Sequence, residues 1–215
     1  MLFRSIRTNC PVSRVRRDEA GVELTSRAGS ERFDRVVFAC HSDQALAMLE
    51  APSEAERQVL GDLGYASNDV VLHTDTRLLP RRRKAWAAWN YERAPSLSAE
   101  NAGVCLHYLI NRLQPLPWQQ PVLVSLNPTR PVAENKVHAR IQYSHPVFDQ
   151  AAIFAQQRVG ELQGRRNTWF CGAWCGYGFH EDGLRSGLEA ADGVLHSLSH
   201  TQQPVLPGAI LEEAL

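Results

Sequence analysis

Residues 169–187 have the sequence WFCGAWCGYGFHEDGLRSG. Their first residues, Trp169–Cys171, are apolar and typical of a short buried strand, and three glycines follow within the next seven positions. Asp182 and Gly183 then open a segment with helical periodicity. The stretch therefore predicts a strand that leads through a glycine-rich loop into the N-terminus of a helix. Backbone amides at such an N-terminus favour anionic groups.

A simpler interpretation of the same stretch is an ordinary strand–loop–helix connection. In that case the glycines serve only the turn, and Asp182 caps the helix by accepting a bond from the amide of Leu184 or Arg185. Spacing alone leaves both interpretations open.

Composition limits the classes of protein to consider. The chain has 215 residues, 44% of them hydrophobic and 21% charged, which is typical of a globular protein. Its formal net charge is zero, so we expect no general attraction to nucleic acid or to an anionic membrane. It has no apolar run of the roughly 18 residues that a membrane span needs and no signal sequence. Five cysteines at irregular spacing argue against a disulfide framework, so we expect a cytoplasmic protein.

Cysteines and histidines in the opening stretch raise the question of zinc. Cys171 and Cys175 are four residues apart, with His180 nearby. Zinc sites usually have four ligands with tighter pairing, and no second Cys or His pair has matching spacing. We therefore predict that the chain holds no metal.

Hydrophobic patterning predicts a mixed fold of class α+β (mixed α/β). Residues 1–64 alternate as a β-meander, followed by an apolar strand at Val36–Ala39 and two short helices, the second with a Ser53–Glu56 capping box. Residues 65–145 predict a separate sheet. Its strands are expected at Asp69–Thr74, Ala85–Tyr91, Gly103–Ile110, Pro121–Leu126 and Val137–Gln142.

Residues 146–200 predict a helix capped by Asp149, a strand at Thr168–Ala173 and a last helix at Gly183–Leu198. We expect the last helix to bury one apolar stripe, which consists of Leu184, Leu188, Ala191 and Leu195. Residues 201–215 predict a flexible tail.

The chain also resembles a known family. Residues 169–187, together with Phe33–Ser42 and Ser144–Asp149, resemble the FAD-dependent amine oxidase and desaturase superfamily, in its bacterial branch of predicted NAD/FAD-binding oxidoreductases. The resemblance runs from about Ile6 to His200. It implies that residues 1–64 and 146–200 belong to an FAD-binding domain and that residues 65–145 form a substrate domain.

The resemblance implies FAD as the cofactor and places one wall of its site in this chain. The helix start at Asp182, Gly183 and Leu184 would face the flavin pyrimidine, although many relatives have glycine where Asp182 stands. Relatives commonly carry an acidic residue in place of Ala173, which cannot bind a ribose or ribityl hydroxyl. The implied cofactor-binding residues are Val12, Gly172, Ala173, Trp174, Asp182, Gly183 and Leu184.

One family feature is missing from the sequence. Members begin with a Gly-x-Gly-x-x-Gly turn after a first strand, and no such spacing occurs here. We therefore expect the chain to be the C-terminal half of an FAD-dependent oxidoreductase that oxidises a small or apolar substrate by hydride transfer. The alternative is a non-catalytic fragment, or a subunit of a split flavoenzyme whose partner chain supplies the Gly-rich FAD-binding segment.

Catalytic residues and the substrate cannot be assigned from sequence. His180 and Glu181 are either an acid–base pair or solvent-facing loop residues. An aromatic set in the central segment either lines an apolar pocket or forms the core of the sheet. This set is Trp86, Trp89, Tyr91, His107 and Tyr108.

Overall fold

The computed structural model describes residues 5–93 and 104–201, which divide into two compact units. Unit 1 combines the described residues up to Gly64 with those from Pro146 onward, and unit 2 is Tyr65–His145. No described helix combines the length and the apolar character that a bilayer crossing requires.

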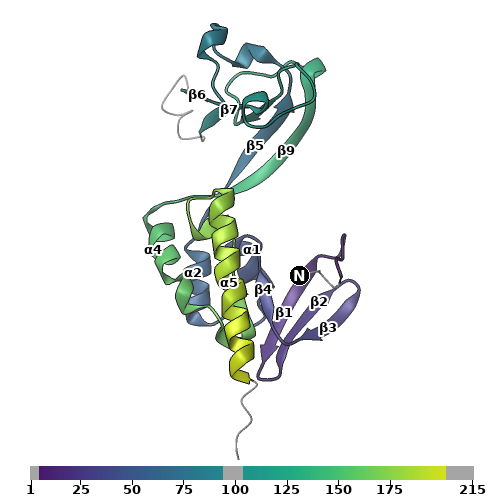
Figure 1. Cartoon of the computed structure of the whole chain (residues 1–215), viewed down its shortest axis with the longest axis vertical. Coiled ribbons are helices and arrows are strands. Elements are labelled where there is room, and N and C mark those ends of the chain that lie inside the picture. Colours follow the sequence, from purple (N-terminus) through teal and green to yellow (C-terminus); the bar gives the residue numbers. More distant parts are fainter. Residues whose placement is uncertain (1–4, 94–103, 202–215) are drawn as a thin grey trace, which may run out of the picture. The chain divides into compact units, whose positions relative to one another are not determined.

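Unit 1 begins with an antiparallel meander of three strands, β1 (Val12–Asp18), β2 (Gly21–Ser26) and β3 (Gly29–Phe33), as Figure 1 shows. The β1–β2 turn needs a glycine, because Gly21 has φ 134° and a Cβ there would lie 2.6 Å from the carbonyl oxygen of Phe33. The predicted meander is confirmed.

The described part of unit 1 also contains a two-stranded parallel sheet and four α-helices. Strand β4 (Val36–Phe38) pairs in parallel with β10 (Thr168–Phe170), so segments far apart in sequence meet here. Helix α2 packs against both α1 and α4, and α5 packs against β10. The helices are α1 (Ser42–Met48), α2 (Glu54–Gly61), α4 (Gln150–Arg158) and α5 (His180–Thr201).

The helix starts follow the sequence signals closely. Ser53 and Glu56 form the predicted capping box of α2, with the amide of Glu56 bonded to the Ser53 hydroxyl and the amide of Ser53 to the Glu56 carboxylate. Asp149 caps α4 by accepting from the amide of Ala152 at 2.9 Å. Glu56 also pairs with Arg17 of β1, and both side chains are almost fully buried.

The last helix differs from expectation in its buried face. Leu184, Leu188 and Leu195 of the predicted buried stripe are 58%, 59% and 60% exposed, and Ala191 is exposed as well. The buried side of α5 is instead made of small and polar residues that allow close approach to β10: Asp182, Ser186 and Ala190. The sequence identified an amphipathic helix but assigned its core to the wrong face. The expected flexible tail lies outside the described residues from 202 onward, and Thr201 is still part of α5.

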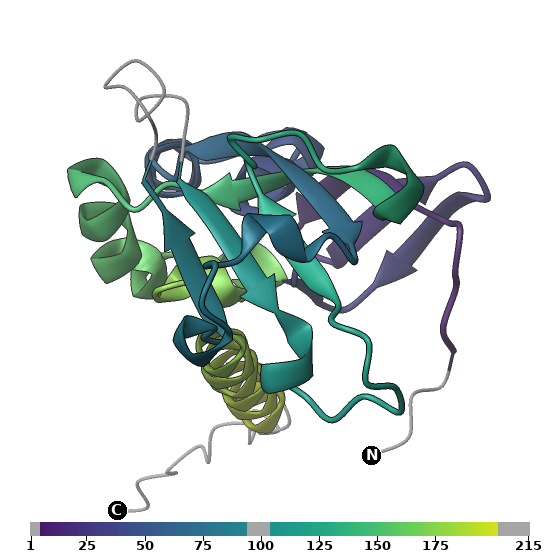
Figure 2. The same ribbon diagram turned by 90° about the horizontal axis from the view of Figure 1, so that it is seen from above.

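Unit 2 is built on a five-stranded sheet with the strand order β6–β7–β8–β5–β9. The pairs β6–β7, β7–β8 and β5–β8 are antiparallel, and Figure 2 shows the strands of this sheet in colours from blue for β5 to green for β9. Short 3₁₀ turns lie between β5 and β6, between β7 and β8, and between β8 and β9. The strands are β5 (Tyr65–His73), β6 (Trp89–Glu92), β7 (Cys105–Leu109), β8 (Leu123–Leu126) and β9 (Val137–Pro146).

One predicted strand begins too early. The expected strand Ala85–Tyr91 starts only at Trp89, and Arg83–Ala85 forms a 3₁₀ turn. Trp86 donates its indole N–H to the carbonyl of Pro80 and packs on Leu79, which holds the chain in a turn instead of a strand. Gly103, the expected start of the next strand, lies outside the described residues.

Candidate functional site

The strand–loop–helix predicted from residues 169–187 is present in unit 1. Strand β10 is fully buried, and its pairing with β4 continues one residue further through a bond from the amide of Cys171 to the carbonyl of Phe38, at 2.8 Å. Phe170 and Phe38 stack with ring centroids 5.3 Å apart. A 3₁₀ turn at Ala173–Cys175 and two glycines then lead to α5. The helix begins at His180, three residues before the expected Gly183.

Gly172 stands where the chain leaves β10. Its φ of 154° favours glycine, and a Cβ would lie 2.6 Å from the indole nitrogen of Trp174. Its amide donates to the Ser186 hydroxyl at 3.0 Å, and that hydroxyl lies 3.1 Å from the carbonyl of Gly172. The glycine is therefore explained by packing within the chain, and its amide is engaged by α5.

Ala173 and Trp174 are the residues of this loop that pack against neighbouring segments. Trp174 is 3% exposed and donates its indole N–H to the carbonyl of Cys40 at 3.0 Å. Ala173 contacts the start of α5, since a Cβ on Gly183 would lie 3.6 Å from the Ala173 nitrogen. These contacts join the segments that follow β4 and β10 to the start of α5, and we call residues 171–183 at this junction the β10–α5 corner.

Asp182 is the most constrained side chain of the loop. One carboxylate oxygen accepts from the amides of Tyr177 and Phe179 at 3.0 and 3.1 Å, and the other accepts from Arg185 at 2.8 Å. Gly176 must be glycine, because a Cβ there would lie 2.4 Å from the carboxylate. The expected cap, with a bond from the amide of Leu184 or Arg185, is wrong: the carboxylate reaches back into the loop because α5 begins before it.

Gly183 and Leu184 lie in the first turns of α5. The amide of Gly183 donates to the carbonyl of Phe179 at 3.2 Å, so the helix leaves the earlier amides of its first turn, at residues 180–182, without an internal partner. Leu184 is largely exposed, whereas Gly183 is half-buried against Ala173. His180 and Glu181 are both exposed, but they lie in the first turn of α5 and not, as the sequence had suggested, in the loop before it.

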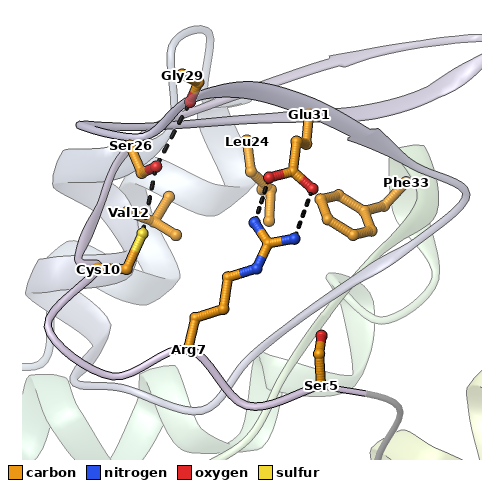
Figure 3. A pocket seen from close by; sticks show the side chains of 9 residues that line it. All are labelled: Ser5, Arg7, Cys10, Val12, Leu24, Ser26, Gly29, Glu31 and Phe33. Carbon is orange, nitrogen blue, oxygen red and sulfur yellow. Dashed lines mark hydrogen bonds and ion pairs between the residues drawn. The ribbon is translucent and has the colours of Figure 1, made fainter.

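Val12 lies in a different part of unit 1. Figure 3 shows it in a cavity of about 290 Å³ on the meander, beside Leu24, Phe33 and an ion pair between Arg7 and Glu31. All residues that line this cavity come from the first 33 positions, so the structure does not bring Val12 into one cavity with the residues of the β10–α5 corner.

The cysteines near the corner are poor metal ligands. Burial raises the pKa of Cys175 to about 12 and also raises that of Cys171, so both thiols stay protonated. Within the described part of the chain, the one group whose ligand atoms lie close enough for a metal is Glu92, Cys105 and His107 of unit 2.

A chain of hydrogen bonds, in which each member donates to the next, connects His73 to Glu92 and His107 of this group. The amide of Asp75 donates to Nδ1 of His73 at 3.0 Å, so Nε2 of His73 carries the proton and donates to the Ser125 hydroxyl at 2.7 Å. Ser125 then donates to Nδ1 of His107 at 2.6 Å, and Nε2 of His107 donates to Glu92 at 2.9 Å. In this arrangement Nδ1 of each histidine accepts a hydrogen bond and Nε2 donates one.

This direction argues against a metal at Glu92, Cys105 and His107. A metal on Nε2 of His107 would place the proton on Nδ1, so the Ser125 hydroxyl would accept from both histidines and its own proton would lose its acceptor. Glu92 is also paired with Arg130 through both carboxylate oxygens. Burial raises the pKa of Glu92, but the bonds from Arg130 and His107 outweigh this and hold it below its usual range.

Sequence reasoning missed this chain, because its members come from four strands. Alternation within each strand does place His73, His107 and Ser125 on the buried face of the sheet. Three polar residues on the inward positions of neighbouring strands were the available signal.

Comparison with solved structures defines the class of fold. The chain matches reduced UDP-galactopyranose mutase with a TM-score of 0.56 at 12% identity, over 93% of this chain and 49% of that one. It matches the cyclohexylamine oxidase from Brevibacterium oxydans with a TM-score of 0.53 at 15% identity, over 88% and 48%. It matches the CLA-producing fatty acid isomerase from P. acnes with a TM-score of 0.53 at 16% identity, over 86% of this chain and 47% of that one. The chain thus has a mixed α+β fold that spans about half the length of these structures.

Residues 3–111 match the family of flavin-containing amine oxidoreductases. The chain belongs to this family, whose members normally bind FAD. No curated protein matches the sequence.

Proposed function

We propose that the chain is part of an FAD-dependent oxidoreductase that oxidises a small or apolar substrate by hydride transfer to the flavin. Unit 1 contributes to the FAD-binding domain, and unit 2 forms the substrate domain. Family membership supports the cofactor, and the β10–α5 corner supports the position of its ring.

The observation that carries this proposal is the environment of Asp182. A free carboxylate at the start of α5 would repel a reduced, anionic flavin. Here two amides and Arg185 satisfy it, and it is 7% exposed. Its charge is therefore compensated inside the corner, and the positive end of the α5 dipole remains available to an electron-rich group.

Each implied cofactor-binding residue then has a defined part. The amides of the first turn of α5, at residues 180–182 just before Gly183 and Leu184, stabilise negative charge on the pyrimidine edge of the flavin. Gly172, Ala173 and Trp174 hold these amides in place through the contacts of the corner. Val12 serves the more distant adenine portion from the meander. The flavin itself supplies the redox chemistry when bound.

The phosphate-binding turn is supplied from outside these 215 residues, either by the same polypeptide or by a partner chain. Two features of unit 1 support such a segment. The parallel pair β4–β10 is small for a parallel sheet, which normally extends over several strands between helices. The exposed stripe of α5 has the 3–4 residue spacing that packs against another helix. The same stripe favours the second candidate function, a subunit that acts by association.

The first experiment measures flavin content. We expect the 215-residue chain to bind FAD weakly or not at all, because the pyrophosphate cradle is missing. Expression together with its flanking coding sequence, where that sequence encodes the Gly-x-Gly-x-x-Gly segment, is expected to give a protein with stoichiometric flavin absorbance. Tight flavin binding by the chain alone would contradict the missing-segment account. Absence of flavin after the segment is supplied would contradict the proposed function.

A further inference from the structure

Four strands of unit 2 align eight apolar side chains on one face of the sheet. The register places Trp89, Tyr108, Val124 and Leu72 directly opposite one another in one row. Tyr91, Leu106, Leu126 and Val70 form the next row. We call these eight residues the platform. Trp89 and Tyr91 are 51% and 65% exposed, and all members except Val70 keep some exposure.

The opposite face of the same strands is buried and rich in polar residues. It carries Asn90, His107, Ser125 and His73, each less than a tenth exposed, together with Leu109 and Leu123. An antiparallel sheet with one solvated face normally turns its apolar side inward and its polar side outward. This sheet does the reverse over much of its area.

Hydrogen bonds on the buried face of the sheet prevent its polar side chains from turning outward. His73, Ser125 and His107 donate in one direction along the chain to Glu92, which accepts, and Asn90 donates to the carbonyls of Ala87 and His107. Moving any of these groups outward would break bonds that several strands share. The outward aromatic residues are therefore a fixed property of the fold, and an apolar cover is needed to remove them from water.

The size of the platform limits the kind of molecule that can cover it. Four neighbouring strands about 4.8 Å apart span roughly 15 Å, and the two platform positions on each strand are roughly 7 Å apart, so the platform measures roughly 15 Å by 7 Å. A stable protein interface buries about 800 Å² on each partner, several times more than this surface offers. The platform also contains no Asp, Glu, Lys, Arg or His, and burial raises the pKa of Tyr108, so its hydroxyl stays neutral.

We propose that the platform binds the uncharged, apolar body of a small elongated substrate, such as an aliphatic chain or one to three hydrocarbon rings. Trp89 and Tyr91 contribute most, because they carry the largest exposed apolar area of the set. This inference rests on the proposed function, since it assigns the substrate class of the same enzyme.

The test is a titration of the full chain with the neutral fluorescent probe N-phenyl-1-naphthylamine, with displacement by 1-decanol and by decanoate. We expect Trp89→Ser to weaken probe binding about tenfold. Trp118→Ser is the matched control, because Trp118 is also 51% exposed but lies outside the platform, between β7 and β8. It should leave binding unchanged, and the uncharged 1-decanol should displace the probe better than decanoate.

A second apolar surface requires its own control. The titration is repeated with Leu188→Glu/Leu195→Glu, which removes the exposed stripe of α5, and the effect of Trp89→Ser must persist. Equal losses in the two tryptophan variants, or no loss in either, would overturn the inference. A dimer in sedimentation that Trp89→Ser dissociates would overturn it in favour of a protein interface. These readouts need no flavin, so they fail or succeed separately from the proposed function.

Discussion

In unit 1 Arg17 and Glu56 form a buried charged pair, whereas in unit 2 two buried histidines and a serine form a hydrogen-bonded chain that ends on a carboxylate. A buried ion pair depends on both charges, because either one alone is left without compensation. A neutral hydrogen-bond chain loses only the bonds at the altered position. The two units should therefore differ in how mutation and pH affect them.

The largest expected effect is in unit 1. Arg17→Met leaves Glu56 buried without its partner, and we expect the free energy of unfolding to fall by about 3–5 kcal/mol. Arg16→Met is the matched control, because the Arg16–Glu23 pair is partly exposed and should be worth about 0–1 kcal/mol. Urea denaturation measures both, and equal losses would remove the contrast between buried and exposed pairs.

The second effect is the response of unit 2 to acid. Burial lowers the pKa of His73 to about 4, below its ordinary value of 6.5. The unfolded chain therefore binds a proton that the folded chain excludes, and stability present above pH 6.5 is lost as the pH falls toward 4. The slope should approach about 1.4 kcal/mol per pH unit. Unfolding measured between pH 7 and 4 checks this, and the slope should shrink in His73→Asn.

Ser125→Ala has a smaller expected effect. It removes one hydroxyl but leaves Nε2 of His73 and Nδ1 of His107 unpaired, which should cost about 1–3 kcal/mol. Ser67→Ala removes an exposed bond to Gln142 and should change stability by less than about 0.5 kcal/mol. Thermal unfolding of the two variants separates the outcomes, and a neutral Ser125→Ala would show that the chain adds no stability.

The smallest effect on stability is expected on the exposed side of α5. Leu188→Glu should change the stability of the chain by less than about 0.5 kcal/mol, because Leu188 is 59% exposed. It should nevertheless abolish binding of the segment that carries the phosphate-binding turn, measured by co-purification. Ser199→Glu, also exposed on α5, should preserve that binding. A large loss of stability in Leu188→Glu would mean that the stripe is covered within the chain itself.

Local sequence signals predicted much of the fold. The Ser53–Glu56 capping box, the Asp149 cap and the meander depend on neighbouring residues, so short-range patterns suffice for them. The buried face of α5 could not be predicted in this way. Its leucines have helical periodicity, but the small residues Ser186 and Ala190 make the closer contact with β10.

The site required long-range contacts that no local pattern contains. Gly172 has to be glycine because the indole of Trp174 lies against it. That indole is held by its hydrogen bond to the carbonyl of Cys40, more than 130 positions away. Asp182 was expected to cap the helix, and only the loop amides of Tyr177 and Phe179 show that its charge is compensated.

The central claim is that the start of α5 faces the flavin ring, and a change of charge there tests it most directly. Gly183→Asp has room for its side chain, with the nearest atom 3.6 Å from the new Cβ, and Gly187→Asp one turn later meets nothing within 4 Å. In the protein supplied with its phosphate-binding segment, we expect Gly183→Asp to make the flavin reduction potential more negative and to weaken FAD binding, while Gly187→Asp changes both much less. Equal potentials in the two variants and the unaltered protein would contradict the account.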